Sequence, residues 1–132
     1  MRYILEINER AIGKQRPRFT RFGSTYTPEK TKNYETMIGY KFKEKYKIEP
    51  SEKPLRVWIV IMFEPPKSLS QKRKEQLLLT EYTKKPDLDN LVKAILDGLN
   101  GIAYKDDNQI IEIEARKEYG KYDNIYIELE EI

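Results

Sequence analysis

Hydrophobic and polar residues alternate in three stretches of the chain, and this period of two predicts β-strands. The first stretch covers residues 2–7, where Tyr3, Leu5 and Ile7 fall on one face. The other two lie near the C-terminus and contain the alternating sets Ile111, Ile113, Ala115 and Ile125, Ile127, Leu129. The segment YGKYDN between them contains a glycine and is typical of a hairpin turn.

The segment PLRVWIVIMFEPP, residues 54–66, is hydrophobic on both faces. One face carries Leu55, Val57, Ile59, Ile61 and Phe63, and the other carries Trp58, Val60 and Met62. This two-sided pattern predicts a central strand. Pro65 and Pro66 have no amide hydrogen to donate to a neighbouring strand, so the strand is expected to end before them.

Three segments have the spacing of amphipathic helices. The first is expected to start at Thr27 and Pro28, a capping hydroxyl followed by proline, and to run to about residue 46. Its hydrophobic stripe is Tyr34, Met37, Ile38, Phe42 and Tyr46. Ser68 or Ser70 is expected to cap a short basic helix in SQKRKEQLLL. The third helix has the stripe Leu88, Leu91, Ile95 and Leu99, and the sequence GLNG ends it.

These elements predict an α+β fold in the order β-α-β-α-α-β-β, with helices packed on a mixed or antiparallel sheet. The chain of 132 residues is long enough for one hydrophobic core. It contains no internal repeat and no low-complexity linker. We therefore expect residues 1–132 to form a single small domain. The stretch RAIGKQRPRFTRFGSTYTP is polar, basic and punctuated by glycine and proline, so we expect a loop or a hairpin there.

The chain contains neither cysteine nor histidine, which excludes disulfides, thiolate metal sites and catalysis by imidazole. A metal would have to be held by oxygen atoms, and this favours Mg²⁺ or Mn²⁺ over zinc. Hydrophobic runs all fall short of the roughly 20 residues that span a bilayer, and the N-terminus lacks the apolar region of a secretory signal. We expect a cytoplasmic protein without membrane contact.

The net charge of +3 is distributed unevenly along the chain. Residues 10–32 contain seven basic residues and one acidic residue, whereas residues 106–132 contain nine acidic and three basic residues. Such segregation favours a cationic surface that binds a polyanion. The alternative is that a chain with 36% charged residues shows such blocks by chance.

Four aspartates gather in KKPDLDNLVKAILDGLNGIAYKDDNQI, residues 84–110. Asp87 and Asp89 stand at the start of the third helix, Lys93 follows Asp89 by one turn, and Asp106 and Asp107 lie beyond the helix end. A purely structural interpretation makes one aspartate a helix cap, Lys93 an ion-pair partner of Asp89, and the last two a turn. The functional interpretation is a metal site for phosphodiester hydrolysis, in which carboxylates hold divalent ions and a lysine stabilises the phosphate.

Two other carboxylate motifs fit this segment poorly. A calcium-binding loop that starts at Asp87 would have Val92 where glycine is needed, and Gly98 where the bidentate glutamate belongs. The P-D…[D/E]-x-K pattern of another nuclease class requires an acid two residues before the lysine. Leu91 occupies that position here.

The sequence KPDLDNLVKAILDGLNG followed by YKDDNQI resembles the signature of the RusA family of Holliday-junction resolvases, the crossover junction endodeoxyribonucleases. In that family a D-x-D-N-L-x-K helix start is followed by a D-D-x-Q-[IV] turn. The segments KQRPRF and YTPEKTKNYE also resemble the N-terminal half of the family. The similarity covers roughly Lys14–Glu35 and Lys85–Ile110.

The resemblance implies a homodimeric, Mg²⁺- or Mn²⁺-dependent endonuclease that makes paired nicks across four-way DNA junctions during DNA recombination and repair. It implies catalytic roles for Asp87, Asp89, Lys93 and Asp107. The same three aspartates are expected to hold the metal, with Asp106 as a further candidate ligand. Proteins of this family are typically encoded by phages and prophages.

Basic residues are the candidates for contacts with DNA phosphates, which give affinity without sequence information. They are Arg16, Arg18, Arg21, Lys30, Lys32, Lys72, Arg73, Lys74, Lys84 and Lys85. Phe19, Phe22 and Tyr26 are interleaved with the arginines and are candidates for stacking on unpaired bases, or alternatively for packing of the loop onto the sheet. Tyr82 is a further candidate wedge.

Two nicks on opposing strands require two active sites related by a two-fold axis, so we expect a C2 homodimer. The second face of the Trp58 strand or part of the first helix is a candidate interface.

Two alternatives to junction resolution remain. One is a carboxylate nuclease acting on flaps, nicks or plain duplex, and the other is a DNA-binding module without enzymatic activity.

Overall fold

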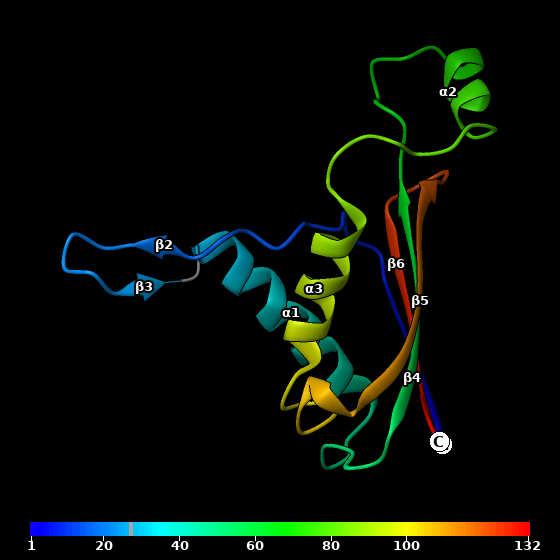
Figure 1. The fold of residues 1–132 in the computed structure, drawn as a ribbon. Coiled ribbons are helices and arrows are strands. Elements are labelled where there is room, and N and C mark those ends of the chain that lie inside the picture. Colours follow the sequence, from blue (N-terminus) through cyan, green and yellow to red (C-terminus); the bar gives the residue numbers. More distant parts are fainter. Residues whose placement is uncertain (27) are drawn as a thin grey trace.

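A four-stranded mixed sheet with two helices on one face forms the body of the protein in the computed structural model, which describes residues 1–26 and 28–132 (Figure 1). The strands of this sheet are β1 (Arg2–Ile7), β4 (Leu55–Phe63), β5 (Ile110–Tyr119) and β6 (Asn124–Glu131). The helices are α1 (Glu29–Lys45), α2 (Gln71–Leu77) and α3 (Leu88–Leu99). A small hairpin, β2 (Arg18–Phe19) and β3 (Thr25–Tyr26), and a 3₁₀ turn, η1 (Asp107–Gln109), complete the fold. The predicted class and order of the main elements are confirmed.

The spatial order of the sheet is β1-β6-β4-β5. β4 pairs in parallel with β5 and antiparallel with β6, so its predicted central place is confirmed. The predicted hairpin at YGKYDN is wrong, because β4 lies between β5 and β6. Their connection instead passes the end of β4, where the Gly120 amide donates to the Phe63 carbonyl (3.0 Å) and the Glu64 amide donates to Asp123 (2.9 Å).

The core lies between the sheet and the pair α1 and α3, which cover the same face (Figure 1). One side of β4 is fully buried there, whereas the other side faces solvent. Trp58 on this open face is 44% exposed and packs edge-on against Tyr126 of β6, with ring centroids 5.8 Å apart. The two-sided hydrophobic pattern of β4 therefore indicates that the strand is central in the sheet. It does not indicate that a second layer covers the other face.

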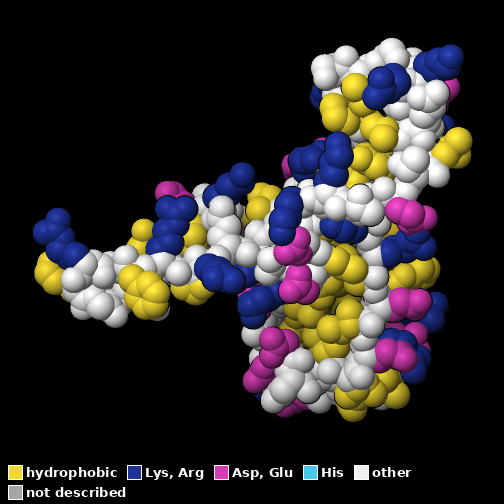
Figure 2. Space-filling view, turned by 45° about the horizontal axis from the view of Figure 1, so that its top comes forward, with side chains coloured by type: hydrophobic (Ala, Val, Ile, Leu, Met, Phe, Trp, Pro, Cys, Tyr) yellow, Lys and Arg dark blue, Asp and Glu magenta, His cyan; other side chains and the backbone are white. Residues whose placement is uncertain are grey.

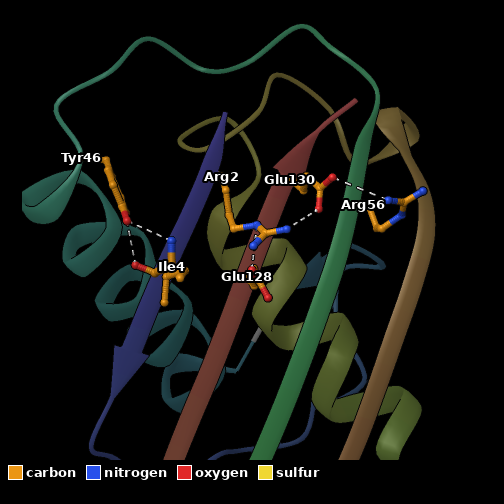
Figure 3. Close-up of polar contacts among 6 residues, drawn as sticks. All are labelled: Arg2, Ile4, Tyr46, Arg56, Glu128 and Glu130. Carbon is orange, nitrogen blue, oxygen red and sulfur yellow. Dashed lines mark hydrogen bonds and ion pairs between the residues drawn. The ribbon is translucent and has the colours of Figure 1, made fainter.

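Charged side chains also cross the open face of the sheet (Figure 3). Arg2 pairs with Glu128 (2.9 Å) and Glu130 (3.1 Å), and Arg56 reaches the same Glu130 at 3.6 Å. Exposed pairs of this kind contribute about 0–1 kcal/mol each. At the edge of the sheet, the Tyr46 hydroxyl accepts from the Ile4 amide (2.9 Å) and donates to the Ile4 carbonyl (3.1 Å), which fixes the end of α1 to β1.

The helices begin close to the predicted positions. The predicted capping residue of α1, Thr27, lies outside the described residues. Pro28, predicted as the first helical residue, is instead the N-cap, one position before the helix begins. Ser70 caps α2 by accepting from the Arg73 amide (3.2 Å). Of the two predicted capping residues, Ser68 and Ser70, Ser70 is therefore the one confirmed. All seven residues of α2 are exposed or half-buried. In the described part of the chain, no helix is long and apolar enough to cross a membrane.

The β2–β3 hairpin projects from the body as a narrow arm, residues 16–26 (Figure 1). Its turn is closed by the Thr20 amide, which donates to the Ser24 carbonyl (2.8 Å), and Gly23 has the positive φ of 85° that favours glycine. The base of the arm is attached to both helices. Thr31 of α1 donates to the Gln15 side chain (3.1 Å), and the Lys14 amide donates to the Asn90 carbonyl of α3 (2.9 Å).

Glycines allow α1 and α3 to approach closely. A Cβ atom on Gly98 would stand 2.9 Å from the Glu35 carbonyl oxygen and 3.2 Å from the Ile38 Cβ. A Cβ atom on Gly39 would meet the Gly98 carbonyl oxygen at 2.8 Å. Because these neighbours are backbone atoms and a buried Cβ, neither site can accept a methyl group without a shift of one helix.

We predict that Gly98→Ala lowers the free energy of unfolding by about 1–2 kcal/mol. Overpacking costs about 1–3 kcal/mol, and the upper part of this range applies because the new methyl group would meet a backbone oxygen. The better helix propensity of alanine recovers about 1 kcal/mol of that cost. Urea denaturation followed by circular dichroism measures the change. Lys41→Ala, at an exposed site on α1, is the control and should change stability by less than about 0.5 kcal/mol. Equal or greater stability of Gly98→Ala would show that the helices are not in close contact.

Candidate active site

A cavity of about 660 Å³ lies between α3, η1 and β5. Its polar lining consists of Asp89, Lys93 and Asp97 from α3 and Asp107 from η1. Its apolar lining is Leu88, Val92 and Leu96 from α3, with Ile113 and Ala115 from β5. Three of the predicted catalytic residues, Asp89, Lys93 and Asp107, are therefore brought together although they come from two separate elements.

The helical period places the polar residues on one face of α3. Asp89, Lys93 and Asp97 follow one another at intervals of four, which on an α-helix align along one side. The opposite side of α3 carries the buried residues Leu91, Ala94, Ile95, Gly98 and Leu99. Burial of this hydrophobic face fixes the rotation of the helix, and so fixes which residues face the cavity.

Asp87 occupies the N-cap position of α3, as the structural interpretation predicted, but its carboxylate makes no capping hydrogen bond among the described residues. It pairs instead with the Lys85 ammonium at 2.7 Å. The hydrogen bond and charge of Lys85, followed by the charge of Lys117, hold the pKa of Asp87 below its usual value. Asp87 is half-exposed and does not belong to the cavity lining.

Asp106 has the structural role of a turn cap. Its carboxylate accepts from the Asn108 amide (3.4 Å), while the Gln109 side chain accepts from the Asp106 amide (2.8 Å), which forms a capping box. Gln109 also donates to the carbonyls of Ser51 (2.8 Å) and Lys53 (3.0 Å). These bonds hold η1 against the segment before β4, and Asp107 is thereby placed at the cavity.

Asp107 lies in a region of accumulated negative charge. Its hydrogen bond with Asp106, some loss of hydration and the charges of Asp106 and Asp97 raise its pKa, and Lys93 opposes them only weakly. A raised carboxyl pKa means that ionisation of Asp107 is less favourable in the folded protein than in water. A cation bound at the cavity would relieve this cost.

The donor chemistry of the cavity fits a hard divalent cation, since it offers carboxylate oxygens in a chain without histidine or cysteine. Within residues 1–26 and 28–132, no three carboxylates converge closely enough to hold one ion. Mg²⁺ usually retains several waters and takes only one or two carboxylates together with substrate phosphates. Two carboxylates, such as those of Asp89 and Asp107, would be sufficient in number, and metal binding by Asp87, Asp89, Asp106 and Asp107 stays a prediction.

Asp97 is a cavity residue that the sequence interpretation did not select. Its carboxylate is 3.1 Å from the Lys14 ammonium, which also pairs with Glu35 of α1. Lys14 is only 14% exposed. Burial disfavours its charge, but the hydrogen bonds and charges of Glu35 and Asp97 outweigh this effect and raise its pKa. The spacing of Asp89, Lys93 and Asp97 at i, i+4 and i+8 could have indicated that Asp97 shares the cavity-facing side of α3.

Lysine and arginine side chains gather on the arm and around α2, with acidic side chains between them (Figure 2). Nine of the ten predicted DNA contacts are exposed, and Lys74 is half-buried. Phe19 and Phe22 on the arm are 77% and 89% exposed, so the alternative that they pack onto the sheet is wrong. Tyr82 is buried and stacks on Phe63 at 4.6 Å, so the structure does not present its ring as a wedge.

Comparison with known proteins identifies the family of the chain. The profile of the family described as Endodeoxyribonuclease RusA matches residues 9–130. The chain belongs to the RusA endodeoxyribonuclease family. A relative from Bacillus subtilis (strain 168), named Uncharacterized protein YqaN, is 37% identical over 71 residues. This similarity covers 51% of the chain and 50% of the relative, so it spans about half the length of that protein.

We predict that Asp106→Asn lowers the pKa of Asp107, because it removes the neighbouring negative charge that helps to raise this pKa. Asparagine caps helical turns as well as aspartate does, so η1 should persist. Carboxyl-carbon NMR titration of the metal-free protein measures the shift. Glu44→Gln, at an exposed site on α1, is the control and should leave the Asp107 titration unchanged. An unchanged or higher pKa in Asp106→Asn would contradict the assigned cause.

Proposed function

We propose that this protein is a metal-dependent endonuclease that resolves four-way DNA junctions by paired nicks. The observation that carries the proposal is the cavity in which Asp89, Lys93 and Asp107 of the RusA-like motif meet, next to two basic projections. The family assignment supplies the endodeoxyribonuclease activity. The junction substrate, the metal and the pairing of the nicks are the proposed refinements.

Asp89 and Asp107 would hold Mg²⁺ or Mn²⁺, with Asp87 and Asp106 as further candidate ligands. When bound, such an ion polarises the scissile phosphate and lowers the pKa of water. Lys93 lines the same cavity and is exposed. The ion pairs described for the α3 region are Lys85–Asp87 and Lys14–Asp97, so the predicted Asp89–Lys93 pair is not formed. We propose that the Lys93 ammonium binds a non-bridging phosphate oxygen, and the absence of this ion pair among the described residues supports that role.

The arm and the region around α2 would bind the branches of the junction. Arg16, Arg18 and Arg21 on the arm are exposed, and contacts of this kind depend on counterion release from the phosphates. Phe19 and Phe22 would stack on bases that are unpaired at the crossover. Such stacking favours a branched substrate, because an intact duplex offers few free base faces.

A C2 homodimer would supply the two active sites that paired nicking requires. The open sheet face around Trp58 and the exposed side of α1 are the candidate contact surfaces. In this assembly each subunit would cut one of two symmetry-related strands. The proposed setting is the cytoplasm, where a phage- or prophage-encoded enzyme of this type would act on recombination and repair intermediates.

The decisive experiment compares a synthetic four-way junction with a linear duplex of matched sequence, each with Mg²⁺ and with EDTA. We expect symmetric nicks in the junction only, dependent on Mg²⁺ and lost in Asp89→Asn. Equal cutting of both substrates would keep the nuclease site but reject junction specificity. Binding without cutting by the wild type would reject the enzyme and favour a DNA-binding module.

We further predict that Lys93→Ala lowers the cleavage rate by at least about 100-fold, because one positioned electrostatic donor is worth about 10²–10³ in rate. Junction affinity in Ca²⁺ should change by less than about threefold, since a single phosphate contact at the site adds little to the total. Lys105→Ala, whose exposed side chain pairs with Glu52 at 3.2 Å outside the cavity, is the matched control. Loss of the circular dichroism spectrum in Lys93→Ala would defeat the assignment.

A further inference from the structure

Lys117 of β5 holds the loop that leads into the catalytic helix. Its ammonium donates to the Lys84 carbonyl (2.7 Å) and to the Pro86 carbonyl (2.8 Å). The carbonyl between these two, that of Lys85, accepts from the Tyr82 hydroxyl (3.0 Å). Three successive carbonyls before Asp87 are therefore each bound by a side-chain donor.

This contact is built on a rigid support. Lys117 is half-buried, and its ammonium lies 5.4 Å from the centre of the Tyr82 ring, a distance at which cation–π attraction acts. Tyr82 itself is buried, stacked on Phe63 and in edge contact with Tyr119 (4.8 Å). The two donors therefore come from a strand of the sheet and from a buried aromatic cluster.

The residues that follow the held loop carry the chemistry. Asp87 comes directly after Pro86, and Asp89 lies in the first turn of α3. Lys85, within the held segment, pairs with Asp87. Loop carbonyls need partners outside regular structure, and those supplied by Lys117 and Tyr82 fix where the chain enters α3. The charge of Lys117 also contributes, after Lys85, to the lowered pKa of Asp87.

We propose that Lys117, assisted by Tyr82, is a positioning residue of the nuclease site, which fixes the loop Lys84–Pro86 and thereby the placement of Asp87 and Asp89. The inference rests on the proposed function and adds residues from outside the RusA-like motif. Two of the three ammonium hydrogens of Lys117 are donated to carbonyls, and the aromatic ring lies beside the ammonium. This arrangement distinguishes Lys117 from the exposed lysines that we assign to DNA phosphates.

The test compares Lys117→Met, which keeps the aliphatic stem without the donors, with Lys117→Arg, which restores donors in a different geometry. Lys121→Met, at an exposed lysine in the connection that follows β5, is the control. We expect Lys117→Met to lower the single-turnover cleavage rate about 10- to 100-fold, because small displacements of catalytic groups have effects of this size. It should raise the Mg²⁺ concentration needed for half-maximal rate, with junction Kd in Ca²⁺ unchanged within about twofold. Lys117→Arg should recover part of the rate, and Lys121→Met should match the wild type.

Two results would overturn the proposal. One is an unchanged cleavage rate in Lys117→Met. The other is weaker junction binding together with an unchanged cleavage rate at saturating DNA. If the slope of log affinity against log salt concentration is also smaller by about one, Lys117 contacts a phosphate and does not position the loop. If Lys117→Met does not fold, Tyr82→Phe tests the same loop. It removes the hydroxyl that donates to the Lys85 carbonyl and keeps the ring. We expect a smaller rate loss with the same Mg²⁺ dependence, and no change would reject the role.

Hydrogen exchange separates this inference from the proposed function. We expect the amides of residues 84–91 to exchange faster in Lys117→Met than in the wild type, and those of α1 to be unchanged. This readout does not depend on nuclease activity. A wild type that fails to cut DNA would reject the proposed function, whereas unchanged exchange in residues 84–91 would reject the positioning role alone.

Discussion

The burial of one face of α3 against α1 and the sheet is the constraint on which the site depends. Leu91, Ile95 and Leu99 are fully buried, and this burial fixes the helix rotation. Consecutive residues on a helix are separated by about 100°, so a rotation by one residue would move Asp89 and Lys93 away from the cavity. The core therefore does more than stabilise the fold, since it also selects which polar residues of α3 share the cavity with Asp107.

Charge in and around the cavity is balanced by contacts from distant segments. Lys14 from the base of the arm pairs with both Asp97 and Glu35, and nearer in the chain Lys85 pairs with Asp87. Asp107 has no comparable compensation from Lys93, and its pKa is raised. The cavity is thus anionic at Asp107, where a divalent cation would bind. The carboxylates of Asp87 and Asp97 are instead paired with lysines.

The local elements could be predicted because their signals are local. The alternation in β1, the two-sided hydrophobic pattern of β4 and the stripe on α3 follow directly from neighbouring residues. The partners of β5 and β6 could not be predicted, because the pattern of a strand does not encode which strand it pairs with. Both strands pair with β4 and not with each other. Exposure of Ile111 and Ile113 follows from the place of β5 at the sheet edge. The same limit applies to the site: the motif indicated Asp89, Lys93 and Asp107, whereas the contacts of Lys14 and Lys117 depend on segments that meet only in the folded chain.

The open sheet face gives the molecule an internal optical reporter. Trp58 is the single tryptophan of the chain, and it lies beside Tyr126 on the face away from α1 and α3. The emission wavelength of an indole depends on how much water surrounds it, so whatever covers this face shifts the fluorescence of the unlabelled protein. The arm carries phenylalanine and tyrosine instead. The tryptophan signal therefore reports coverage of the sheet face and not occupation of the arm.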